Sequence, residues 1–181
     1  DNGPVLDDGY VDQANEKIGK HQPAGPYRAG KYSCFEGGTR VPFIIRYPQH
    51  IPAGKVSKAL LGQVDLATTL TKMGGGKNPA KGFLDSRNCS SALLGKSPTG
   101  RPHLIHEANK LALRIGNWKY IPEGGRTRDF LGPWKPIKIP AGGMLFDLSA
   151  DPGEKKNIAQ EHPDQVEKND DFAAKNSLAT G

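Results

Sequence analysis

Short apolar runs separated by turn residues dominate the pattern of this chain. Residues 41–47, Val-Pro-Phe-Ile-Ile-Arg-Tyr, form a near-continuous apolar run that ends at Pro48. Such a run is typical of a strand that is buried on both faces of an α/β sheet. Gly and Pro interrupt residues 1–40 throughout, so we expect a long loop region ahead of this strand.

A helix is predicted after this strand. The residues that recur at the spacing of one helical face are Leu66, Thr69, Leu70 and Met73. Asp65 stands where an N-cap is expected, and the glycines at 74–76 end the helix. Residues 74–102 are rich in turn residues, so we interpret them as a connection between two subdomains.

The rest of the chain predicts a small sheet and a helix. Residues 111–115 and 118–121 flank Gly116-Asn117, a signal for a tight hairpin, and residues 144–148 add a strand. A weakly amphipathic helix is expected from Pro163 to about Asn176, with Val166 and Phe172 as its apolar contacts. The expected fold class is the end of an α/β layer followed by a small antiparallel sheet with a C-terminal helix. We place the division at 1–95, the end of the α/β domain, and 96–181, a small α+β subdomain.

The composition and net charge limit the kinds of molecule that this chain is expected to bind. The 25 Lys and Arg exceed the 19 Asp and Glu, and the formal net charge of +6 favours contact with polyanions such as sulfated glycans. The basic residues are scattered without an Arg-rich or aromatic-interleaved stripe, so no nucleic-acid site is indicated. A basic module that holds an anionic polymer without cleaving it stays open as an alternative. No apolar run approaches the roughly 18 residues that a membrane span needs.

Few residues carry candidate chemistry on their own. Asp1-Asn2-Gly3 places a carboxylate beside an amide oxygen, and such hard oxygen donors bind calcium or magnesium, although the tripeptide is also a common turn. Lys31 lies in a glycine-rich loop before the apolar run, where α/β sites form; the alternative is a solvated surface lysine. Cys34 and Cys89 lack the spacing of a zinc or thioredoxin-like site, and a single disulfide between them stays open.

The motifs occur in an order that resembles the type I sulfatases of the alkaline phosphatase superfamily. They are Asp1-Asn2-Gly3, Gly30-Lys31, residues 36–42 (Glu-Gly-Gly-Thr-Arg-Val-Pro) and Tyr47-Pro48, with further matches at 64–69, 113–120 and 145–154. The resemblance covers about residues 1–160. It implies an alkaline phosphatase-like fold, incomplete here, and hydrolysis of the sulfate ester of a sulfated carbohydrate or an aryl sulfate. A phosphoesterase of the same superfamily is an alternative, because phosphate and sulfate are both tetrahedral.

The resemblance also implies roles for individual residues. Asp1 and Asn2 match calcium ligands that are shared with ligands outside this chain, and Lys31 matches the lysine that contacts the sulfate and the leaving oxygen. The family nucleophile is a formylglycine made from Cys or Ser in a Cys/Ser-x-Pro/Ala-x-Arg motif, which the 181 residues lack. We therefore expect this chain to be inactive alone and to work with the N-terminal part of the same sulfatase. Family habit implies a periplasmic or secreted location.

The remaining residues of the motifs are assigned to structure. Gly37 and Gly38 permit tight turns, and an ion pair between Glu36 and Arg40 is expected to hold the loop. Three histidines are candidates for lining the sulfate or substrate site, with an ordinary surface or hydrogen-bonded histidine as the alternative for each: His21, His103 and His106.

Overall fold

The computed structural model describes residues 2–77, 82–130 and 135–177. The chain divides into two compact units: residues 1–42 together with 105–181, and residues 43–104. This grouping differs from the division at residues 95/96, which stays a prediction about domains. Within the described residues, every helix is too short or too polar to cross a membrane.

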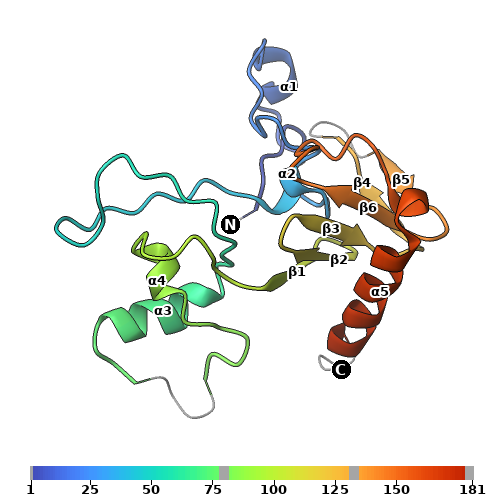
Figure 1. Ribbon diagram of the computed structural model, residues 1–181. Helices are drawn as coiled ribbons and strands as arrows, with labels where there is room; N and C mark the ends of the chain where they lie inside the picture. The colour runs from blue at the N-terminus through green and yellow to red at the C-terminus, as the bar shows by residue number, and fades with distance from the viewer. Residues whose placement is uncertain (1, 78–81, 131–134, 178–181) are drawn as a thin grey trace. The chain divides into compact units, whose positions relative to one another are not determined.

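A four-stranded sheet forms the centre of the larger unit (Figure 1). The predicted hairpin is confirmed, because β2 and β3 pair antiparallel with Leu113 opposite Tyr120. Gly116 in its turn has φ of 57°, a conformation that glycine adopts without steric cost. The predicted strand at 144–148 is also confirmed, as β6, which pairs antiparallel with β3. In sheet order the strands are β1 (His103–Glu107), β2 (Leu111–Ile115), β3 (Trp118–Ile121) and β6 (Met144–Asp147).

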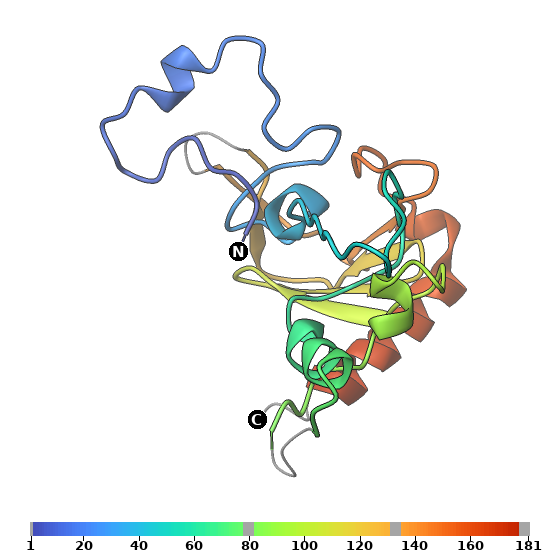
Figure 2. The same ribbon diagram turned by 90° about the vertical axis from the view of Figure 1, so that its left-hand side faces the viewer.

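The two faces of this sheet bury different elements. The predicted C-terminal helix is confirmed as α5 (Pro163–Ser177), preceded by the 3₁₀ turn η1 (Ala159–Glu161). On one face of the sheet, Val166 of α5 packs beside Tyr120 and Leu145. Because side chains alternate along a strand, Ile121 and Phe146 project from the opposite face, where they pack with Phe35. Figure 2 shows α5 and α2 (Glu36–Thr39) on opposite sides of the sheet.

The first 42 residues are mostly irregular, as expected, with two one-turn helices, α1 (Ala14–Lys17) and α2. Phe35, directly before α2, is completely buried and contacts Phe146 edge to face, with ring centres 6.0 Å apart. A second, two-stranded antiparallel sheet, β4 (Arg126–Arg128) and β5 (Pro136–Lys138), completes this unit. Both cysteines lie in described residues, and Cys34 and Cys89 are each buried free thiols.

The smaller unit contains α3 (Asp65–Met73) and α4 (Ser90–Leu93). The predicted helix is confirmed, and it ends as expected where Gly74 N donates to Leu70 O over 2.9 Å. The N-cap assignment was wrong, because Asp65 is the first helical residue. Its carboxylate accepts hydrogen bonds from Gly62 N, 2.9 Å away, and from Arg101 Nη1, 2.8 Å away.

The strand predicted at residues 41–47 is wrong for the described structure. These residues have no strand conformation, and Phe43 is 52% and Ile44 93% exposed. A buried strand needs a neighbour that pairs with its backbone N–H and C=O groups, and no described strand pairs with this segment. Of the expected fold class, the described residues form the small sheet with its terminal helix but not the α/β layer.

Candidate active-site loops and a buried charge cluster

The opening motif and the Lys31 loop lie against each other. Gly3 N donates to Gly38 O and Lys31 N donates to Pro4 O, each over 2.8 Å. Both bonds join residues that are far apart in the sequence, so the segment 2–4 is held between α2 and the loop that carries Lys31. The two backbone segments are therefore adjacent, and the placement of the Lys31 ammonium group beside Asp1 and Asn2 stays a prediction.

Glycine is required where these segments meet. A Cβ atom on Gly3 would lie 1.8 Å from Gly37 O, and one on Gly38 would lie 2.1 Å from Ser33 O. A Cβ atom on Gly37 would lie 2.3 Å from Arg28 O. Backbone atoms cannot yield as a flexible side chain can, so this packing supports the structural role expected for Gly37 and Gly38.

The proposed calcium ligands are only partly described. Asp1 lies outside the described residues. Asn2 is exposed, and its amide group donates to Gly3 O over 2.9 Å. In the described part of the chain, no group of three or more His, Cys, Asp or Glu residues could hold a metal ion. An exposed amide oxygen suits a cation with further ligands from elsewhere, and the ligand roles of Asp1 and Asn2 stay predictions.

Lys31 is half-buried, and its loop is fixed by backbone contacts. Its ammonium nitrogen lies 4.9 Å from the centre of the Tyr32 ring, and Arg128 Nη1 donates to its carbonyl oxygen over 3.4 Å. Tyr32 itself has φ of 70°, which is uncommon for a residue other than glycine. The loop conformation therefore depends on its surroundings rather than on local preference.

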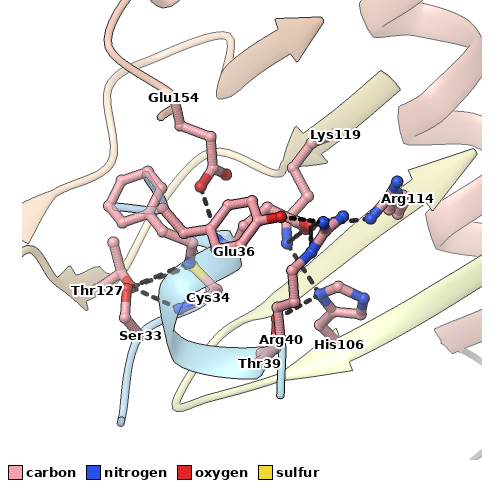
Figure 3. Close-up of polar contacts among 12 residues, drawn as sticks. Ser33, Cys34, Glu36, Thr39, Arg40, His106, Arg114, Lys119, Thr127 and Glu154 are labelled. Carbon is pink, nitrogen blue, oxygen red and sulfur yellow. Dashed lines mark hydrogen bonds and ion pairs between the residues drawn. The ribbon is translucent and has the colours of Figure 1, made fainter. Parts of the chain in front are cut away.

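A cluster of charged and polar side chains surrounds Glu36, at the start of α2 (Figure 3). We call it the Glu36 cluster, and its members are Glu36, Arg40, His106, Arg114, Lys119 and Glu154. Lys119 Nζ lies 3.0 Å from Glu36 Oε1, and Arg114 Nη1 lies 2.9 Å from Oε2. The expected pair between Arg40 and Glu36 is present at 3.1 Å. Burial alone raises the pKa of Glu36, but the cations, Lys119 first and then Arg114, outweigh it and lower the pKa to about 2. The carboxylate of Glu36 is therefore ionised and bound by three cations.

His106 belongs to this cluster. Its Nδ1 lies 2.9 Å from Lys119 Nζ and 3.0 Å from Thr39 Oγ1. Burial, and then the charge of Lys119, lower the pKa of His106 to about 3, so the ring is neutral at pH 7. Its Nε2 is buried and has no hydrogen-bond partner among the described residues. His21, by contrast, is exposed; a substrate-binding role for either histidine stays a prediction.

Glu154 binds the backbone N–H of Glu36. Its Oε2 accepts a hydrogen bond from Glu36 N over 2.6 Å (Figure 3). Burial raises the pKa of Glu154 to about 7, although the nearby Lys119 acts in the opposite direction. Glu36 is thus held by its backbone N–H on one side and by its carboxylate on the other, which fixes α2 on the sheet.

Known proteins resemble this chain in sequence and in fold. The family model described as Sulfatase matches residues 1–76. An N-acetylgalactosamine-6-O-sulfatase of Bacteroides thetaiotaomicron is 41% identical over 171 residues, which cover 92% of this chain and 33% of that protein. A solved structure from work on the metabolism of multiple glycosaminoglycans by Bacteroides thetaiotaomicron has 38% identity and a TM-score of 0.82, covering 99% of this chain and 37% of the other. The chain belongs to the sulfatase family.

Other relatives match a smaller part of this sulfatase chain. An N-acetylgalactosamine-6-sulfatase of Sus scrofa is 38% identical over 96 residues, or 52% of the chain and 18% of that protein. The chain spans about a third or less of the length of these curated relatives. Activity and substrate are properties of a whole protein, so these similarities alone do not assign them to this chain.

Sequence reasoning missed half of the Glu36 cluster in this sulfatase chain. It selected Glu36, Arg40 and His106 but neither Lys119, Arg114 nor Glu154. One signal was available, because Lys119 follows Trp118 in a predicted strand and shares a face with Ile121. A lysine on the buried face of a strand needs an acidic partner, but the identity of that partner is a tertiary fact.

Proposed function

We propose that this chain is part of an enzyme that hydrolyses the 6-O-sulfate ester of an N-acetylgalactosamine unit in a glycan. The supporting observation is the backbone pairing of residues 2–4 with the Lys31 loop, which joins a candidate cation ligand to a candidate catalytic ammonium group. The names of two relatives, from Bacteroides thetaiotaomicron and Sus scrofa, supply the substrate class.

In this proposal each group of residues has a different role in the reaction. Asp1 and Asn2 would hold a calcium ion, which supplies positive charge against the sulfate oxygens. Lys31 would place its ammonium group at the leaving oxygen and stabilise the negative charge that develops there. The Glu36 cluster would keep α2 and the Lys31 loop in position, and the nucleophile would come from residues outside this chain.

Sulfate release by the full-length protein that carries this sequence tests the proposal. With N-acetylgalactosamine 6-sulfate as substrate and ion chromatography as the readout, we expect kcat/KM at least about tenfold above that for the 4-sulfate and the 6-phosphate. Faster release of phosphate would instead indicate a phosphoesterase. Salt-sensitive binding to a sulfated glycan without any release of sulfate would indicate a binding module.

The contact at Gly3 gives a separate prediction. Gly3→Ala is expected to lower kcat by about tenfold or more, because its methyl group would meet Gly37 O and displace segment 2–4 from α2. Sulfate release and far-UV circular dichroism measure activity and fold. The matched control is Gly74→Ala, whose Cβ would lie an ordinary 3.4 Å from Leu70 O, with kcat expected within about twofold of wild type. Equal kcat in both variants would show that the close approach at Gly3 is not needed.

A further inference from the structure

We propose that Lys119 is a positioning residue for Lys31, acting through Glu36 and α2. The inference rests on the proposed function and assigns a role to a residue that does not touch the substrate. Lys119 lies in β3, one of the two internal strands of the sheet, and has no exposed surface. A fully buried ammonium group is costly unless it is paired, so its contacts show what the residue holds in place.

The contacts of Lys119 converge on one short helix. Its Nζ lies 3.0 Å from Oε1 of Glu36, the first residue of α2, and 2.9 Å from Nδ1 of His106. His106 in turn reaches Thr39, the last residue of α2, with Nδ1 3.0 Å from Oγ1. Lys119 is therefore bonded directly to the start of α2 and, through one imidazole ring, to its end (Figure 3).

Helix α2 is hydrogen-bonded to both candidate site segments, the loop that leads to Lys31 and the opening motif. Gly37 N donates to Arg28 O over 2.9 Å, in the loop that leads to Lys31, and Gly38 O accepts from Gly3 N over 2.8 Å. Ser33 N closes the turn around Lys31 by donating to Gly30 O over 3.1 Å. A shift of α2 would therefore move the Lys31 loop and the opening motif.

The two arginines of the cluster do not substitute for this lysine. Arg114 and Arg40 both bind Oε2 of Glu36, and Arg40 is exposed. Lys119 binds Oε1 from the interior of the sheet, so it alone among these three cations fixes the second carboxylate oxygen. Without Lys119, Glu36 keeps its two arginine partners on Oε2 but loses the cation that fixes Oε1.

A double-mutant cycle in the full-length enzyme separates positioning from general stability. Lys119→Met is expected to lower kcat for sulfate release at least about fivefold, with KM changed less than about twofold. Combined with Lys31→Ala, it is expected to add less than about a twofold further loss, because Lys119 acts through Lys31. A double variant whose loss is the product of the two single losses, or Lys119→Met with wild-type kcat, would overturn the proposal.

Controls make each outcome decisive. Tyr120→Phe alters the next residue of β3, on the opposite face, and removes the 3.1 Å hydrogen bond to Asp170; its effect on kcat is expected within about twofold and multiplicative with Lys31→Ala. If Lys119→Met does not fold, Lys119→Gln, which keeps a polar group at the site, carries the same cycle. A wild-type enzyme that releases no sulfate overturns the proposed function itself, whereas an active enzyme with independent Lys31 and Lys119 effects overturns only the positioning role.

Discussion

Replacing Lys31 by alanine is expected to lower kcat of the full-length enzyme by more than tenfold, and by about 10²–10³-fold if its ammonium group meets the leaving oxygen directly. A fixed positive charge at that oxygen acts mainly when the S–O bond breaks, so its loss reduces kcat more than substrate affinity. The fold should persist, because the loop is held by backbone bonds such as the one from Lys31 N to Pro4 O. Initial rates of sulfate release at saturating substrate measure the effect.

The matched control for this variant is Lys20→Ala. Lys20 is an exposed lysine in the same irregular region, so its replacement changes the net charge equally. We expect its kcat to stay within about twofold of wild type. If the Lys31 variant turned over as fast as the Lys20 variant, the ammonium group of Lys31 would have no part in the reaction.

The fold was predictable from sequence wherever neighbours in the chain also pair in space. Gly116-Asn117 joins two adjacent strands, and the apolar spacing from Leu66 to Met73 is local to one helix, so both elements were found. Residues 41–47 show the opposite case. Their apolar pattern predicts that the segment is buried. A strand also requires a neighbouring strand that pairs with its backbone, and the local sequence pattern does not supply that information.

The candidate site was predictable as a set of motifs but not as an arrangement. The order of Asp1-Asn2-Gly3, Gly30-Lys31 and Glu36 indicated a family, and hydrogen bonds from Gly3 and Lys31 then joined the segments. The Glu36–Lys119 pair joins residues separated by 83 positions. No periodicity links such distant residues, so the sequence did not identify Glu36 as the partner of Lys119.

Replacing Glu36 by alanine is expected to destabilise the full-length protein by about 3–5 kcal/mol, because Lys119 would stay buried without its carboxylate. Removing both charges, as Glu36→Ala with Lys119→Met, should recover a large part of that loss.

The low pKa of Glu36 adds a pH test. Its contribution is present above the unfolded pKa near 4.5 and is lost as pH falls towards its folded value of about 2. The stability difference between wild type and Glu36→Ala should therefore shrink over that window in urea denaturation.

The control is an ion pair of the same kind at the surface. Glu161 Oε1 lies 2.8 Å from Lys156 Nζ, closer than the Glu36–Lys119 pair, but the two side chains are 53% and 69% exposed. Glu161→Ala is expected to change stability by less than about 1 kcal/mol, since water replaces the lost partner. Equal losses in the two variants would mean that burial adds nothing to the Glu36 pair. The Glu36 cluster would then be unable to hold α2, and the positioning of Lys31 through Lys119 would lose its physical basis.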